Sequence, residues 1–93
     1  MYKKIELKEL LSSLDGWQAV EGREAIFKKL KFNDFKDAFA AMTKIADKAD
    51  TMDHHPEWFN VYNNLEVTLT THDAGGVTSY DKELAEYIDE VST

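Results

Sequence analysis

The feature that most constrains the fold is a pair of short strand-like runs, residues 57–62 and 65–71, which meet at Asn63-Asn64. In the second run, leucine and valine alternate with polar residues, the pattern of a strand with one buried face. Asparagine tolerates the positive φ of a two-residue turn, so the two runs predict an antiparallel hairpin. A lone hairpin is marginally stable, so further strands or a helical layer must cover its apolar face.

The rest of the chain supplies those layers. Thr78, with Asp81 three residues later, has the form of a helix cap before the last apolar stripe. A longer stripe with steps of three and four residues predicts a long helix whose apolar side lies in the core. This stripe consists of Phe35, Phe39, Met42, Ile45, Ala46, Ala49 and Met52. The expected elements are helices over residues 5–14 and 34–52 and after Thr78, and strands over residues 17–20, 25–31, 57–62 and 65–71.

These elements predict one α+β domain over residues 1–93, in the order α-β-β-α-β-β-α. Its simplest form is a four-stranded antiparallel sheet with helices on one face. The composition narrows the functions that such a domain can have. A net charge of -7 disfavours direct binding of nucleic acid. Absence of cysteine excludes disulfides, thiolate metal sites and cysteine nucleophiles. The first residues contain no unbroken apolar run, so we expect neither a signal peptide nor a membrane span.

The three histidines form the candidate site. With a turn at Asn63-Asn64, strand pairing places His55 opposite His72, and opposed residues have Cβ atoms roughly 5 Å apart. His54 borders the same place, so we expect all three imidazoles to converge at the open end of the hairpin. Imidazoles donate and accept protons near neutral pH. The pattern therefore favours acid–base chemistry on a small ligand, with Trp58 either beside that ligand or anchored in the core.

A metal site and a hydrolase are the other two interpretations. Zinc would need the histidines together with aspartates, for which Asp50, Asp53, Asp73 and Asp81 are candidates. Adjacent histidines on extended backbone point in opposite directions, and no histidine pair has the helical i, i+4 spacing, so zinc ranks second. A Ser–His–Asp hydrolase ranks third, because no serine lies in a strained-turn motif.

Two stretches of the chain resemble a known family. The segment DHHPEWFNVYNNLEVTLTTHDAGGVTSYD resembles the core of the pterin-4a-carbinolamine dehydratases, also known as dimerisation cofactors of a homeodomain transcription factor. EGREAIFKKLKFNDFKDAFAAMTKIA resembles the stretch before that core, and the likeness covers about residues 14–91. The family signature is an acidic residue, three spacers and His-His-Pro-x-Trp, with Thr-His and an aspartate downstream. Here it consists of Asp50, His54, His55, Pro56, Trp58, Thr71, His72 and Asp81.

The resemblance implies a cytoplasmic lyase without metal or organic cofactor. It would remove water from the 4a-hydroxytetrahydropterin, such as 4a-hydroxytetrahydrobiopterin, left by aromatic amino acid hydroxylases, and so give the quinonoid dihydropterin. The family's catalytic positions fall on His54, His55, His72 and Asp81. The substrate contacts that it implies are His54, His55, Pro56, Trp58, Thr71, His72, Asp73 and Ala74.

The resemblance also bears on partners. It implies a homodimer or homotetramer assembled through sheet edges and the long helix, with no membrane and no direct nucleic-acid contact. A transcription-factor partner is possible by family analogy alone. The alternative function is a non-catalytic interaction module of the same fold, either a transcriptional coactivator or an assembly factor. The intact set of three histidines favours the enzyme, because a scaffold would not need them.

Overall fold

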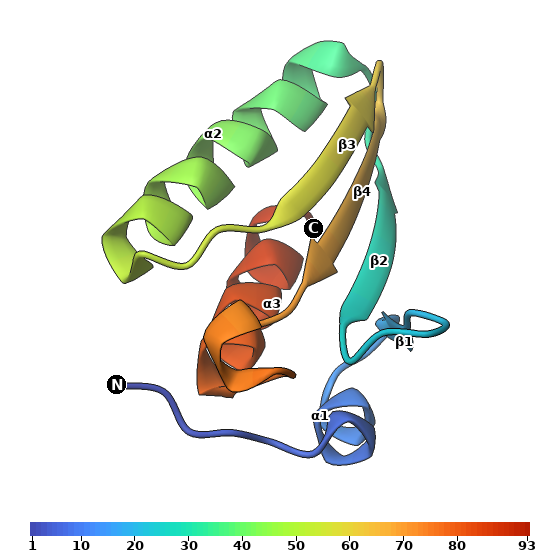
Figure 1. Cartoon of the computed structure of the whole chain (residues 1–93). Coiled ribbons are helices and arrows are strands. Elements are labelled where there is room, and N and C mark those ends of the chain that lie inside the picture. The colour runs from blue at the N-terminus through green and yellow to red at the C-terminus, as the bar shows by residue number, and fades with distance from the viewer.

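A computed structural model describes all 93 residues and confirms the expected order of elements. The four strands form one antiparallel sheet in the order β1-β2-β4-β3. Figure 1 shows α2 and α3 on the same side of this sheet. No helix is both long enough and apolar enough to cross a bilayer. The elements are α1 (Leu7–Ser13), β1 (Gln18–Ala19), β2 (Ile26–Lys31), α2 (Phe35–Met52), β3 (Glu57–Val61), β4 (Asn64–Leu69), the 3-10 helix η1 (His72–Ala74) and α3 (Ser79–Val91).

The core lies between the sheet and the helices. Strand β4 alternates as predicted, because its leucines and valine are buried and the residues between them are half-buried. These side chains pack against Ile45 of α2 and against Leu84 and Ile88 of α3, all fully buried. The apolar pattern of β4 therefore directs both long helices onto one face of the sheet.

Helix α2 buries only part of the predicted stripe: Ile45 and Ala49 are buried and Met42 and Met52 pack partly buried against the core, but three members of the stripe are exposed. Phe35 and Phe39 are 48% and 55% exposed, and their rings stack with centroids 5.7 Å apart. Ala46 is exposed as well. The buried face consists of Ala38, Ala41, Ile45 and Ala49. Three of these four are alanines, which let the helix lie close to its neighbours, so the bulky phenylalanine rings turn outward.

The β3–β4 turn falls one residue earlier than predicted. It is formed by Tyr62 and Asn63, and Tyr62 takes a left-handed conformation with φ 54°. Asn63 Nδ2 donates a hydrogen bond to the Phe32 carbonyl (2.9 Å), and the Phe32 N–H donates to the Asn63 carbonyl (2.8 Å). Asn63 therefore ties the turn to the end of β2, and Asn64 begins β4.

This turn shifts the predicted strand register by two residues. Trp58 pairs with Val67, where Leu69 was predicted, and the predicted opposition of His55 and His72 is wrong. Each strand side chain still lies on its predicted face, because a shift of two residues preserves the alternation. His72 also leaves the strand, since it begins η1.

The first residues of the chain extend along the loop that precedes α3. The Ile5 N–H donates to the Val77 carbonyl (3.0 Å), and the Ser79 N–H donates to the Lys3 carbonyl (2.8 Å). An isolated antiparallel bridge joins Lys4 and Thr78 at the same place. The N-terminal segment thus holds the loop from which α3 begins.

Candidate active site

The start of α3 buries a carboxylate. The Thr78 Oγ1 accepts the Tyr80 N–H (3.2 Å), and Asp81 Oδ2 accepts the Thr78 N–H (2.8 Å). This reciprocal arrangement confirms the helix cap predicted from sequence. Asp81 has no exposed surface. A carboxylate suits this position, because the N-terminus of a helix carries a partial positive charge.

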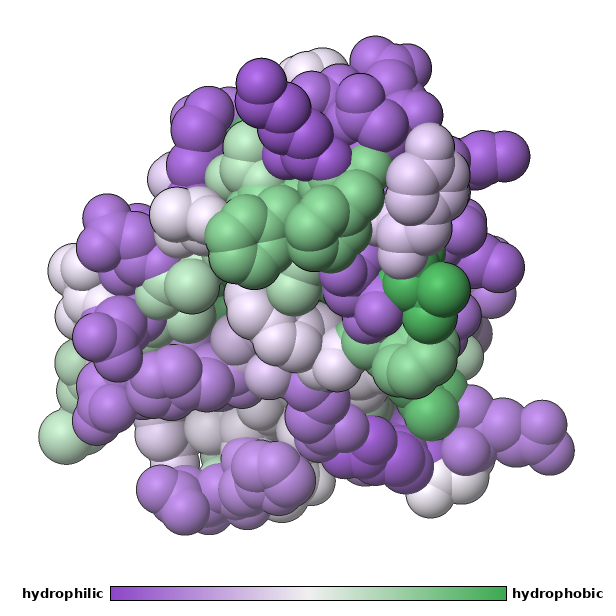
Figure 2. Space-filling model, turned by 90° about the horizontal axis from the view of Figure 1, so that it is seen from above, coloured by the Kyte–Doolittle hydropathy of each residue, from purple (hydrophilic) through white to green (hydrophobic).

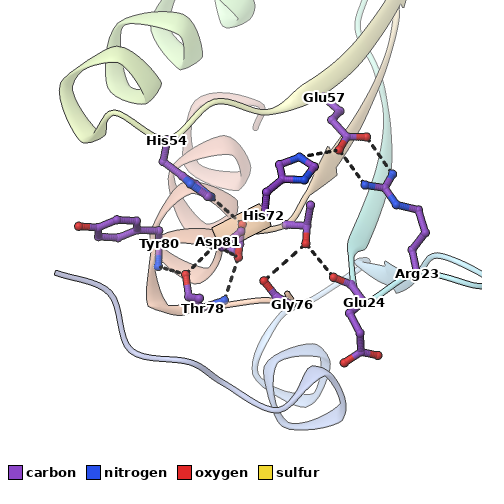
Figure 3. Close-up of polar contacts among 11 residues, drawn as sticks. Arg23, Glu24, His54, Glu57, His72, Gly76, Thr78, Tyr80 and Asp81 are labelled. Atoms are coloured by element: carbon purple, nitrogen blue, oxygen red, sulfur yellow. Dashed lines mark hydrogen bonds and ion pairs between the residues drawn. The ribbon is translucent and has the colours of Figure 1, made fainter. Parts of the chain in front are cut away.

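His54 and Thr71 complete the surroundings of this carboxylate, and Figure 3 shows His54 pointing toward Asp81. His54 Nε2 lies 2.7 Å from Asp81 Oδ1, and the Thr71 hydroxyl donates to Asp81 Oδ2 at 2.7 Å. His54 is 8% exposed and Thr71 6%. His54 precedes β3 and Thr71 follows β4, so the antiparallel pairing places both at the open end of the hairpin, beside the start of α3.

The end of α2 explains why His54 lies inside. Asp53 takes a left-handed conformation with φ 52°, and the His54 N–H donates to the Ala49 carbonyl (3.0 Å). This is the Schellman form of helix ending. Pro56 then disfavours helical geometry at His55, so the chain continues extended into β3.

The other two histidines lie apart from this buried cluster. His55 Nε2 is 3.3 Å from Asp50 Oδ1, and both side chains are exposed. His72 Nε2 is 3.7 Å from Glu57 Oε2, also at the surface. The three histidines thus occur as three separate acid–imidazole pairs. The imidazoles and carboxylates do not gather in any group of three that could hold a metal ion.

Glu57 is fixed by a neighbour that sequence reasoning missed. Arg23, in the β1–β2 turn, donates to both Glu57 oxygens at 2.9 and 2.8 Å. The hydrogen bond from Arg23 lowers the pKa of Glu57, and His72 adds a smaller effect in the same direction. Conversely, the hydrogen bond to Glu57 raises the pKa of Arg23. His72 therefore lies beside a carboxylate that stays ionised. No local pattern could reveal this contact, because the two residues belong to different hairpins.

Two hollows lie beside these histidines. A groove of about 680 Å³ runs between α2 and β3, and His55, Pro56 and Trp58 line it together with Asp50. A smaller hollow of about 240 Å³ is lined by Thr71, His72 and Arg23, among others. Asp73 and Ala74, two of the residues expected to touch substrate, line neither hollow. The remaining expected contacts thus lie in these two hollows and, for His54, in the buried cluster.

An aromatic pair beside His54 was also missed from sequence. The Tyr80 ring centroid lies 5.6 Å from that of His54, and the Tyr2 ring meets Tyr80 edge-on, with centroids 5.6 Å apart. The sequence places Tyr80 in the last helix, but its contact with Tyr2 depends on how the N-terminal segment packs against the fold. Tyr80 therefore lies beside the His54 imidazole, and Tyr2 packs against Tyr80.

Comparison with known proteins places the chain in a family. The family described as pterin 4 alpha carbinolamine dehydratase matches residues 2–91. A Burkholderia pseudomallei (strain 1710b) protein named "Putative pterin-4-alpha-carbinolamine dehydratase" is 58% identical over 86 residues, covering 92% of this chain and 85% of that protein. The crystal structure of a transcriptional coactivator/pterin dehydratase from Brucella melitensis has a TM-score of 0.93 and 46% identity, covering 98% of this chain and 99% of that one. The chain therefore belongs to the pterin 4 alpha carbinolamine dehydratase family.

Proposed function

We propose that this protein dehydrates 4a-hydroxytetrahydropterin to the quinonoid dihydropterin by histidine acid–base catalysis. The observation that carries the proposal is the 2.7 Å contact between His54 Nε2 and the fully buried Asp81. A carboxylate in this position stabilises an imidazolium formed during proton transfer. Family membership supports the substrate class, because the relatives are named as dehydratases of a pterin carbinolamine.

The reaction needs two proton transfers. One group gives a proton to the 4a-hydroxyl, so that the C4a–O bond breaks and water leaves. Another group takes the proton from the neighbouring ring N–H, and the C=N double bond forms. Because one proton is delivered and one is accepted, the total number of protons on the enzyme is unchanged, and exchange with solvent returns the donor and the acceptor to their starting states. Positioned imidazoles can contribute about 10²–10⁴-fold to such a step.

The surroundings of the three histidines suggest separate roles. His54 accepts the ring proton, because Asp81 stabilises the resulting positive charge. His55 lies in the groove beside Pro56 and Trp58, where a flat heterocycle has room, and delivers the proton to the leaving hydroxyl. His72, held near Glu57, lines the smaller hollow and helps to position the pterin.

We also propose that the chain acts as a cytoplasmic homo-oligomer. Phe59, Val61 and Tyr62 are 61%, 55% and 60% exposed along the edge strand β3 and its turn. Unpaired sheet edges invite pairing with another chain. Phe35 and Phe39 add an exposed aromatic pair on α2. Figure 2 shows apolar groups on the upper surface of the molecule, surrounded by polar residues.

The same exposed aromatics support the second candidate function, a protein-interaction module. The Brucella relative is described as a transcriptional coactivator as well as a dehydratase. The two functions are separable by assay, because only the enzyme needs its histidines.

The decisive experiment measures dehydration of enzymatically generated 4a-hydroxytetrahydropterin with and without the protein. The uncatalysed rate is subtracted at each pH. We expect a catalysed rate with a bell-shaped pH dependence, because one imidazole must be protonated and another free. His55→Ala should lower that rate strongly, whereas the control Lys48→Ala should not. Lys48 pairs with Glu83 on the helical side and lines neither hollow. A rate equal to the uncatalysed one would refute the proposal.

A further inference from the structure

We propose that Thr71 and Thr78 are positioning residues that fix Asp81 and, through it, keep the proton of neutral His54 on Nε2. His54 Nδ1 is then the nitrogen that exchanges a proton with the substrate. The exchange of a proton between Nδ1 and the substrate rests on the proposed function, whereas the assignment of donor and acceptor in each hydrogen bond does not.

The direction of the threonine chain follows from counting protons. Thr71 Oγ1 lies 2.7 Å from Asp81 Oδ2 and 2.8 Å from Thr78 Oγ1. A hydroxyl has one proton to donate, and a carboxylate accepts only. Thr71 therefore gives its proton to Asp81, and Thr78 gives its own to Thr71. The Tyr80 N–H donates to Thr78 Oγ1 and completes the chain.

The proton between Asp81 and His54 is assigned in the same way. Asp81 Oδ2 already receives the Thr78 N–H and the Thr71 hydroxyl, so it carries no proton of its own. Across the 2.7 Å contact at Oδ1, the shared proton stays on the imidazole, because an imidazole is ordinarily a stronger base than a carboxylate. Nε2 is therefore the donor, and neutral His54 has a bare Nδ1.

The bare nitrogen is not fully enclosed by the protein. Among fully buried side-chain nitrogens and oxygens, Ser92 Oγ is the one atom without a hydrogen-bond partner. His54 Nδ1 makes no hydrogen bond within the fold, yet it is not such an atom, so it reaches the surface. A nitrogen that reaches the surface, carries no proton and belongs to an imidazole held by a buried carboxylate is arranged to accept a proton.

A helix cap alone would need fewer hydrogen bonds to Asp81 than the structure contains. Capping requires one Asp81 oxygen to accept the Thr78 N–H. Here the carboxylate takes three donors, two of them side chains from outside α3, His54 and Thr71. The surplus contacts fix the orientation of the carboxylate relative to the imidazole.

The test combines a spectroscopic and a kinetic measurement. Histidine labelled with ¹⁵N is introduced, and long-range ¹H–¹⁵N correlation at about pH 8.5, above the usual histidine titration range, identifies the bare nitrogen of each ring. In the wild type we expect the His54 proton on Nε2. Thr71→Val should shift His54 toward a mixture of tautomers and lower kcat about ten-fold. Thr71→Ser keeps the hydroxyl and should restore both readings.

A proton on His54 Nδ1 in the wild type would overturn the inference without any variant. A Thr71→Val protein with wild-type tautomer and wild-type kcat would overturn it as well. If Thr71→Val does not fold, the smaller Thr71→Ala is measured in its place with the same expectations. Failure of the dehydration assay in the wild type would refute the proposed function, but it would leave the tautomer measurement standing.

Discussion

Replacing Asp81 by alanine should destabilise the fold strongly, and the contacts of this residue give the size of the effect. Three donors would lose their acceptor: the His54 N–H, the Thr71 hydroxyl and the Thr78 N–H. The Thr71 hydroxyl can turn elsewhere, whereas the other two donors stay close to the helix start. Each buried donor without a partner costs roughly 1–3 kcal/mol, so we expect a loss of about 3 kcal/mol. At roughly 4–8 °C per kcal/mol for a domain of this size, Tm should fall by about 10–25 °C.

Urea unfolding followed by tryptophan fluorescence and far-UV circular dichroism measures this loss. Asp81→Asn is the matched variant, because its carbonyl oxygen still accepts from Thr78 and Thr71. Its amide N–H groups face His54 Nε2 and so favour the opposite tautomer. We therefore expect Asn to retain more stability than Ala but to lose turnover to a similar degree. The exposed Asp73→Ala serves as the surface control, with a change within about 0.5 kcal/mol. A loss below about 1 kcal/mol for Asp81→Ala would refute the reasoning.

Three further outcomes are expected. His54→Ala should lower turnover and should also lower the free energy of unfolding by about 2–3 kcal/mol, because a buried, hydrogen-bonded ring is lost. His55 and His72 are exposed, so replacing either by alanine should lower turnover alone. Equal urea midpoints for all three variants would contradict this. The Arg23 hydrogen bond lowers the pKa of Glu57, so their pairing stabilises the fold above the ordinary carboxyl range and is lost as pH falls through the lowered value. Glu57→Gln should therefore lower the urea midpoint at about pH 7 and match the wild type in strong acid, and a midpoint difference independent of pH would show that the pair has no such role. Sedimentation equilibrium at micromolar concentration should show a dimer or tetramer, and a monomer alone would exclude assembly through β3 or α2.

Local patterns were sufficient for much of the fold. The alternation in β4 and the cap formed by Thr78 and Asp81 depend on residues two or three positions apart, and both appear as predicted. The cap pattern also predicted that Asp81 lies at the start of the last helix. It did not predict that Thr71 and His54 form hydrogen bonds with Asp81. Strand–strand–helix order followed from the same short-range signals. Features of this kind are readable because their energetics are local.

The parts that failed depend on distant contacts. Asn63 sets the turn by bonding to Phe32, which no pattern around residues 57–71 could reveal. The left-handed Asp53 decides that His54 is buried and His55 exposed, and a sequence shows only two adjacent histidines. In α2, the phenylalanines and the alanines form two apolar faces, and the fit against the sheet selects the alanines. The sequence therefore predicted that the histidines lie near the open end of the hairpin, but it did not predict which carboxylate each histidine contacts.

The strand order β1-β2-β4-β3 has a consequence for how the chain folds during synthesis. The central pair joins β2 to β4, segments separated by the whole of α2 and β3. Closing so long a loop carries an entropic cost, and non-local pairing of this kind slows folding. A nascent chain therefore cannot form the middle of its sheet until β4 has left the ribosome. Its buried carboxylate arrives later still, with the first turn of α3, so His54 has no partner until that turn has been synthesised.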